Sequence, residues 1–335
     1  MLTSTLHFRR HFLPPRCRVQ KGGIGTSGGE QYPRRHSRTV RYPKFLPNLL
    51  QVIILAVVQG LAELLPVSSS AHVIVAEKLM GLAPSAPAMT LLLVMLHTGT
   101  MFAVIVYFWK RWRQLYFSSR EAFKRIAVLI VIATAITGLL GEILIKLIEK
   151  YGFHNAPDAD VEQLFSHLEL IAPALAMAGI LILVAGLRER RQIQRRPGSG
   201  IGISPQQSGL IGAVQGLCLP FRGFSRSGAT ISVGMLVDVT KEQAENFSFA
   251  LAVVLTPAVI AREAQRLVKA HAGSGSVSIS SAVLPSFLGA VFAFVAGLVA
   301  LKWLSQWLET GRWYLFGIYC LLAAAIVAML KSAGY

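Results

Sequence analysis

Residues 89–109, MTLLLVMLHTGTMFAVIVYFW, contain no Asp, Glu, Lys or Arg. An apolar helix of about 20 residues is long enough to cross the hydrocarbon core of a bilayer. Similar apolar windows recur along the chain at 126–147, 170–187, 247–261, 282–301 and 313–330. The sequence therefore predicts an all-α, polytopic membrane protein.

The composition agrees with this prediction. The 335 residues are 53% hydrophobic and only 15% charged, whereas roughly 25% of the residues of a soluble domain are charged. The formal net charge of +17 would suit nucleic acid or anionic lipid. Because the chain is so apolar, we expect membrane lipids and no nucleic acid as its partners. The three cysteines, Cys17, Cys218 and Cys320, show neither a disulfide framework nor a metal-binding spacing.

The first 44 residues differ from the rest. They hold ten Lys and Arg residues and one acid, Glu30, and they lack the apolar region of a signal peptide. We predict that residues 1–44 form a disordered basic tail, with a transit peptide as the alternative interpretation. Residues 45–335 are then the membrane-embedded domain.

The charged linkers predict the topology. The linkers 110–125 and 188–208 are basic, and the linker 149–169 between them is acidic. Basic linkers remain in the cytoplasm, so we place the acidic linker outside the cell and the protein in the inner (cytoplasmic) membrane. From this order of spans we also expect the segment around residues 63–72 to open outward.

Two segments of the chain resemble each other. Residues 56–70 read AVVQGLAELLPVSSS, and residues 212–227 read GAVQGLCLPFRGFSRS. Both run from an apolar stretch through a Gly or Pro break to a Ser cluster, so we interpret them as an internal repeat with halves of about 45–147 and 168–331. Interrupted membrane segments of this kind are typical of broken or re-entrant helices. Chance similarity is the alternative. The sequence does not show whether the two copies have opposite orientations in the membrane.

The first copy carries an acid, hydroxyls and an imidazole. A carboxylate such as Glu63 inside an apolar segment costs a few kcal/mol unless it is solvated, paired or metal-bound. Gln59 lies one turn earlier on the same helical face. After Pro66 follow Ser68, Ser69, Ser70 and His72. This set offers a base or metal ligand, a nucleophile and a proton donor. In the alternative interpretation, the serines only cap the next helix.

The second copy predicts a phosphate site. Residues 220–230, PFRGFSRSGAT, place a glycine turn and hydroxyl side chains before a new helix. Free N–H groups at a helix start bind phosphate, and an Arg side chain offers two parallel donors to its oxygens. The candidate residues are Ser225, Arg226, Ser227 and Thr230. The alternative is that Arg226 only reaches a lipid headgroup.

The segments QGLAELLPVSSSAH at 59–72 and RGFSRSGATIS at 222–232 resemble the two signatures of the bacterial undecaprenyl-diphosphatase family, also called the bacitracin-resistance protein family. HTGTMFAVIVYFW at 97–109 and NFSFALAV at 246–253 are also similar to that family. The resemblance covers about residues 46–331. It implies a hydrolase that converts undecaprenyl diphosphate into undecaprenyl phosphate and inorganic phosphate for peptidoglycan synthesis. A divalent cation, Mg²⁺ or Ca²⁺, would assist.

The resemblance also implies site residues. Catalytic positions match Glu63, Ser69, His72 and Arg226, and Glu63 would also bind the metal. The diphosphate would contact Ser68, Ser225, Ser227, Thr230 and Gln59. One position departs from the family pattern, because Arg222 stands where the family has Pro before the motif glycine. We expect a changed turn there, and an extra cation that faces the phosphates.

Two alternatives stay open at this point. The residues fit either a Ser69 nucleophile or a metal-activated water. Broken helices and an internal repeat also suit a flippase that carries the phosphorylated polyprenyl lipid. The cluster of acid, hydroxyl and imidazole favours hydrolysis, because carriage requires no proton transfer.

Overall fold

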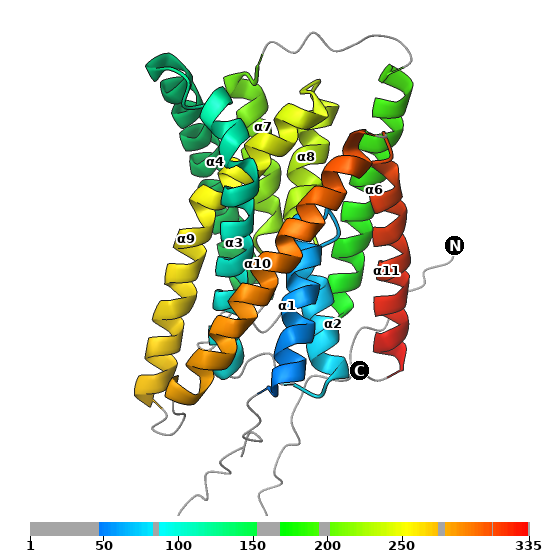
Figure 1. Cartoon of the computed structure of the whole chain (residues 1–335). Coiled ribbons are helices and arrows are strands. Elements are labelled where there is room, and N and C mark those ends of the chain that lie inside the picture. Colours follow the sequence, from blue (N-terminus) through cyan, green and yellow to red (C-terminus); the bar gives the residue numbers. More distant parts are fainter. Residues whose placement is uncertain are drawn as a thin grey trace, which may run out of the picture. The chain divides into compact units, whose positions relative to one another are not determined.

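The structure is a computed structural model that describes residues 47–82, 87–152, 168–193, 202–273, 279–309 and 311–333. The tail predicted at 1–44 lies outside these residues. Within them all regular structure is α-helical, which confirms the predicted fold class (Figure 1). The helices are α1 (Leu49–Leu64), α2 (Ser69–Leu79), α3 (Pro87–Leu115), α4 (Arg120–Gly152), α6 (Leu168–Ile193), α7 (Pro205–Cys218), α8 (Arg226–Leu236), α9 (Lys241–Gly273), α10 (Ile279–Glu309) and α11 (Tyr314–Ser332).

Six of the described helices are long and apolar enough to cross a membrane. The six apolar windows of the sequence predicted each of them: Met89–Leu115, Arg120–Tyr151, Leu168–Arg191, Lys241–Arg262, Val283–Leu304 and Tyr314–Ser332. Large apolar side chains on these helices remain exposed, as on α10, where Leu284, Val295 and Val299 are exposed. Such a surface suits contact with lipid. The chain is a multi-pass membrane protein.

The other four helices are short. They contain 16, 11, 14 and 11 residues in α1, α2, α7 and α8, fewer than the roughly 20 needed to cross a bilayer. α1 packs on α2, and α7 packs on α8. We call residues 49–79 the first hairpin and residues 205–236 the second hairpin. In Figure 1 the first hairpin occupies the lower half of the bundle, and the second hairpin occupies the upper half.

The two hairpins begin with the same local structure. Asn48 caps α1 by accepting a hydrogen bond from the backbone of Gln51, whose side chain accepts one from Asn48 N in return. Ser204 and Gln207 form the same reciprocal pair at the start of α7. Such a capping box satisfies N–H groups that a helix start leaves unpaired. The spacing from Asn48 to Gln59 is the same as the spacing from Ser204 to Gln215.

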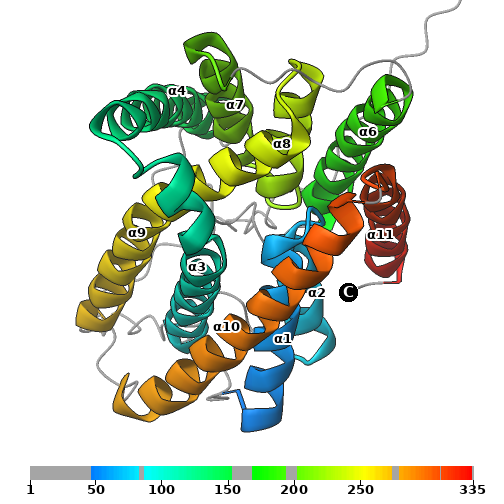
Figure 2. The ribbon, with the colours of Figure 1, turned by 45° about the horizontal axis from the view of Figure 1, so that its top comes forward.

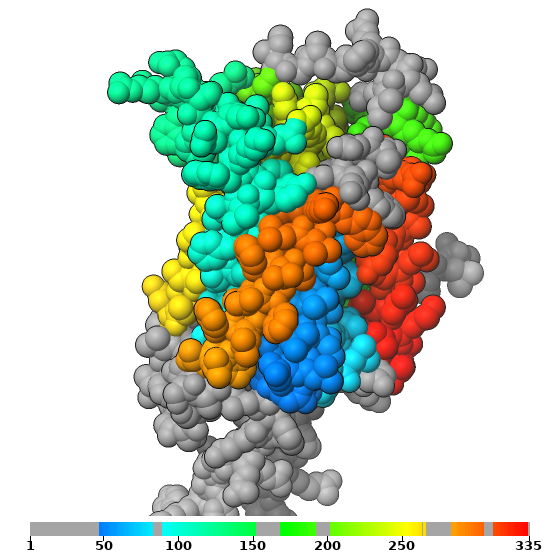
Figure 3. Space-filling view, viewed as in Figure 1, coloured from blue at the N-terminus to red at the C-terminus, as the bar shows by residue number. Residues whose placement is uncertain are grey.

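The repeated glycine is the point at which each hairpin packs on a long helix. A Cβ on Gly60 would lie 2.6 Å from Ala296 Cβ and 2.7 Å from the Ala293 carbonyl oxygen of α10. A Cβ on Gly216 would lie 3.0 Å from the Thr137 carbonyl oxygen of α4. Figures 2 and 3 show α10 lying along α1. The shared capping boxes and glycine contacts support the internal repeat, which stays a prediction. Re-entry of the two hairpins into the bilayer also stays a prediction.

Candidate active site

Glu63 lies in the last turn of α1, where its carboxylate accepts three hydrogen bonds from described residues. Oε2 accepts a hydrogen bond from Gln59 Nε2 at 3.1 Å and another from the Ser69 hydroxyl. Oε1 pairs with the Arg226 guanidinium of the second hairpin. The side chain is only 12% exposed. A carboxylate in an apolar helix is costly when it is unpaired, and these contacts offset that cost.

Ser68 makes the turn that brings Ser69 back to Glu63. Its φ of 70° lies in the left-handed region, which is unusual for a residue other than glycine. Ser68 stands at the N-cap of α2, but its side chain makes no capping hydrogen bond and lies 3.3 Å from the Ser70 hydroxyl. The helix-capping interpretation is therefore wrong for the Ser68 side chain. Backbone strain of this kind gathers at functional sites.

The second hairpin presents the start of α8. Ser225 caps this helix and accepts a hydrogen bond from Gly228 N at 3.2 Å. Before it, Gly223 has a φ of 106°, and a Cβ there would lie 2.7 Å from the Ile171 carbonyl oxygen of α6. Only glycine fits this turn, because the turn needs both the positive φ and the close approach. The turn places Arg226 at the first position of α8, beside Glu63.

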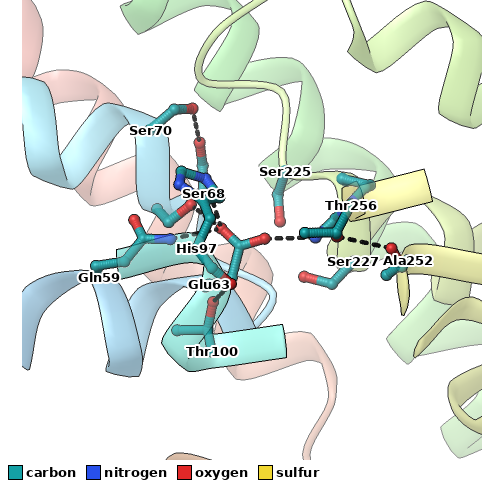
Figure 4. Close-up of polar contacts among 12 residues, drawn as sticks. Gln59, Glu63, Ser68, Ser70, His97, Thr100, Ser225, Ser227, Ala252 and Thr256 are labelled. Atoms are coloured by element: carbon teal, nitrogen blue, oxygen red, sulfur yellow. Dashed lines mark hydrogen bonds and ion pairs between the residues drawn. The ribbon is translucent and has the colours of Figure 1, made fainter. Parts of the chain in front are cut away.

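The two other predicted residues of α8, Ser227 and Thr230, make contacts with backbone carbonyl oxygens. Ser227 Oγ donates to the Leu65 carbonyl oxygen at 3.3 Å and so joins the two hairpins. Thr230 Oγ1 donates to the Arg226 carbonyl oxygen at 2.8 Å. Figure 4 shows the Glu63 carboxylate between Gln59 and His97 on one side and Ser225 and Ser227 on the other. The structure thus brings Gln59, Glu63 and Ser69 of the first hairpin together with Arg226 of the second.

His72 is the predicted site residue that points elsewhere. Its Nδ1 lies 2.7 Å from the Ser68 carbonyl oxygen. Because a carbonyl only accepts, Nδ1 carries a proton, and in the neutral ring Nε2 accepts from the Tyr319 hydroxyl at 2.7 Å. The two rings also stack, with centroids 5.7 Å apart. His72 is therefore held against α11, and its role as a general acid or base stays a prediction.

His97 is a neighbour of Glu63 that the sequence motifs missed. Its Nε2 lies 3.8 Å from Glu63 Oε2, and its side chain is 39% exposed. Nδ1 lies 2.8 Å from the Leu93 carbonyl oxygen, so the proton sits on Nδ1 and the other ring nitrogen faces the carboxylate. An imidazole in the middle of an otherwise uncharged apolar span was the signal that could have identified it.

Comparison with known proteins shows the family of this chain. A family model described as bacitracin resistance protein BacA matches residues 52–326. This chain belongs to that family. The second hairpin, the first hairpin from residue 52 onward, and all the residues that contact Glu63 lie inside the matched region.

Three relatives illustrate the BacA family. The "Undecaprenyl-diphosphatase 2" of Acinetobacter baylyi is 58% identical over 286 residues, which cover 84% of this chain and 98% of the relative. The "Undecaprenyl-diphosphatase" of Rhodopirellula baltica is 31% identical and covers 85% of this chain and 99% of its own length. A protein of the same name from Methanococcus aeolicus is 31% identical, with coverages of 84% and 98%.

The described residues offer little to a metal ion by themselves. No three His, Cys, Asp or Glu side chains gather at one point in the part of the chain that the structure describes. Mg²⁺ often takes only one or two carboxylates and completes its shell with water and substrate phosphates. Glu63 fits a cation of that kind, as one oxygen ligand beside a bound diphosphate.

Proposed function

We propose that this chain hydrolyses undecaprenyl diphosphate to undecaprenyl phosphate and inorganic phosphate. The names of its BacA relatives support this substrate. One observation supports the reaction most directly: the Glu63 carboxylate contacts the Ser69 hydroxyl of the first hairpin and the Arg226 guanidinium of the second. A carboxylate base, a hydroxyl and a phosphate-binding guanidinium therefore lie in contact within a membrane protein.

The geometry suggests a chemical role for each group. Arg226 and the N–H groups at the start of α8 hold oxygens of the terminal phosphate. The Ser69 oxygen attacks the terminal phosphorus, and its proton passes to Glu63. The bond between that phosphorus and the bridging oxygen breaks, and undecaprenyl phosphate leaves. Water then releases inorganic phosphate from Ser69. A divalent cation, Mg²⁺ or Ca²⁺, held by Glu63 and the diphosphate, would neutralise phosphate charge.

The test is phosphate release by the purified protein from undecaprenyl diphosphate, with and without a chelator. We expect undecaprenyl phosphate and inorganic phosphate in equal amounts, and a lower rate after chelation. A rate that survives EDTA and desalting would exclude the cation. Brief reaction with substrate labelled in the terminal phosphate should leave label on the protein, and Ser69→Ala should remove it. Turnover without labelled protein would point to an activated water instead.

Transport is the competing function, and vesicles separate it from hydrolysis. Movement of the polyprenyl lipid across a vesicle membrane, without phosphate release, would overturn the proposal in favour of a flippase. We expect hydrolysis in the same vesicles. In cells, hydrolysis would recycle the carrier lipid for peptidoglycan synthesis, and overproduction should raise bacitracin resistance.

We further propose that the protein lies in the inner membrane with its site open to the outside. The basic segment 110–125 supports a cytoplasmic position for the end of α3. Cysteines placed one at a time, in a background without Cys17, Cys218 and Cys320, test this. In intact cells an impermeant thiol reagent should label Tyr151→Cys but not Ser119→Cys. Ser70→Cys should follow Tyr151→Cys, and labelling of Ser70→Cys only in opened cells would overturn the outward opening.

A further inference from the structure

The turn between α1 and α2, residues 65–68, lies against both the start of α8 and α11. On the α8 side, a Cβ on Gly228 would lie 3.1 Å from the Pro66 carbonyl oxygen. On the α11 side, the thiol of Cys320 donates a hydrogen bond to that same oxygen at 3.5 Å. α11 therefore contacts the turn that leads into Ser69, although it takes no part in the chemistry proposed above.

Tyr319, beside Cys320 on α11, reaches the end of this turn through His72. The Tyr319 hydroxyl lies 2.7 Å from His72 Nε2, and the two rings stack. His72 Nδ1 lies 2.7 Å from the Ser68 carbonyl oxygen, closer than the 3.4 Å of the backbone hydrogen bond from His72 N to that oxygen. Both ring nitrogens are therefore bound within the protein, because Tyr319 donates to Nε2 and Nδ1 donates to Ser68.

The Ser68 carbonyl belongs to the residue whose backbone sets the direction of Ser69. Ser68 has a φ of 70°, and its own side chain makes no capping hydrogen bond. A residue other than glycine persists in this region only when the surrounding structure holds it there. His72 holds the Ser68 carbonyl and Cys320 holds that of Pro66. Both restraints lead to α11.

α11 is itself fixed against α6. A Cβ on Gly317 would lie 2.6 Å from Leu183 N and 2.7 Å from the Gly179 carbonyl oxygen, so the two helices touch through their backbones. Tyr319 follows Gly317 by two residues. A side chain can orient another group only when its own position is fixed by packing, and this contact provides that fixed position.

We propose that Tyr319 is a positioning residue that fixes the His72 ring. Through its Nδ1–H, His72 in turn holds the Ser68 carbonyl. This restraint keeps the Ser69 hydroxyl on Glu63, a role that rests on the proposed phosphatase function. A serine that attacks phosphorus needs its oxygen in one place, since misplacement of a reacting group by about 1 Å can reduce the rate about 100-fold.

Loss of a single hydroxyl tests this role. Tyr319→Phe keeps the ring, so it should lower kcat about tenfold and leave KM nearly unchanged. Tyr314→Phe is the matched control, because it makes the same change on α11 where the ring packs against Arg190, and it should keep full turnover. An unchanged kcat in Tyr319→Phe would overturn the proposal. A raised KM with an intact kcat would also overturn it, since Tyr319 would then contact the substrate.

Two amides at position 72 separate positioning from proton transfer. The side-chain nitrogen of His72→Asn can take the place of Nδ1 and donate to the Ser68 carbonyl, whereas the longer His72→Gln places its nitrogen nearer to Nε2. We expect His72→Asn to turn over about tenfold faster than His72→Gln. Neither amide can act as an acid or base, so equal losses in both would overturn the positioning role in favour of proton transfer.

The double variant completes the cycle. Tyr319→Phe added to His72→Asn should cost no further turnover, because the nitrogen that the hydroxyl contacts is already absent. A further tenfold loss, as large as that of Tyr319→Phe alone, would show that Tyr319 does not act through His72 and would overturn the proposal.

Nitrogen-15 NMR of histidine-labelled protein tests the contact without activity. The His72 signals are those that His72→Asn removes. They should show a proton on Nδ1 and a hydrogen-bonded Nε2, and Tyr319→Phe should shift the Nε2 signal. An unshifted Nε2 signal would overturn the contact. A shifted signal in a chain whose wild type releases no phosphate would instead preserve the contact and overturn the proposed phosphatase function.

Discussion

The first and second hairpins start alike and differ at their tips. Both begin with a capping box, and both place the glycine of a Gln-Gly-Leu sequence against a long helix. At its tip the first hairpin offers the carboxylate of Glu63 and the hydroxyl of Ser69. The second offers the guanidinium of Arg226 and the N-terminus of α8. Two hairpins that start alike thus bring side chains of opposite charge, Glu63 and Arg226, into contact.

Gln59 and Gln215, the glutamines of the two Gln-Gly-Leu sequences, show how the two tips differ. Gln59 donates to Glu63. Gln215, the corresponding residue, is 1% exposed, and its side-chain nitrogen and oxygen have no partner among the described residues. Leu219, which corresponds to Glu63, is 41% exposed. Only the first hairpin has the acid, which is why we assign the base to the first hairpin and phosphate binding to the second.

Glu63→Gln should therefore have the largest effect. The amide keeps the shape of the side chain but removes the base, so phosphate release should fall at least about 100-fold. The measurement is turnover of the purified, folded variant. Leu219→Gln, at the corresponding position of the second hairpin, is the matched control and should retain turnover. Near-normal activity in Glu63→Gln would contradict the division of roles between the hairpins.

Arg226→Lys tests the other tip and should have the next largest effect. Lysine keeps the charge but loses the planar fork that pairs with two phosphate oxygens. Turnover should fall at least about tenfold, or about 1.4 kcal/mol of transition-state stabilisation. Arg262→Lys, at an exposed position of α9, serves as the control and should be unchanged. Full activity in Arg226→Lys would show that a diffuse positive charge is sufficient at this tip.

Alanine at the two repeated glycines should affect stability. Gly60→Ala should lower the free energy of unfolding by about 2–3 kcal/mol and Gly216→Ala by about 1 kcal/mol, because the added methyl meets closer atoms at Gly60. Thermal unfolding in detergent measures both. Gly138→Ala is the control, since a Cβ there meets nothing within 4 Å. Equal unfolding temperatures for all three variants would refute the packing role of these glycines.

Deletion of residues 1–44 should have the smallest effect. The tail lacks an apolar segment, and every residue of the site lies beyond it. Insertion into membranes and the rate of phosphate release should match those of the full chain. An inserted but inactive truncation would disprove this expectation. Removal of the tail by a targeting peptidase in cells would favour the transit-peptide interpretation.

Most of the helices could be predicted from local pattern. The six apolar windows became the six candidate spans, and Pro66 follows directly after the end of α1 and its cap. The same patterns indicated Glu63 and Arg226 as candidate site residues, because a charge in an apolar segment stands out. Hydropathy and helix breakers act over a few residues, so a single sequence displays them directly.

The tertiary structure decided which of these side chains meet. Arg226 pairs with Glu63 across 163 positions of the chain, and His97 joins them from α3. His72, by contrast, turns to Tyr319 of α11. Helical periodicity tells which residues share a face, but packing between distant helices determines what that face contacts.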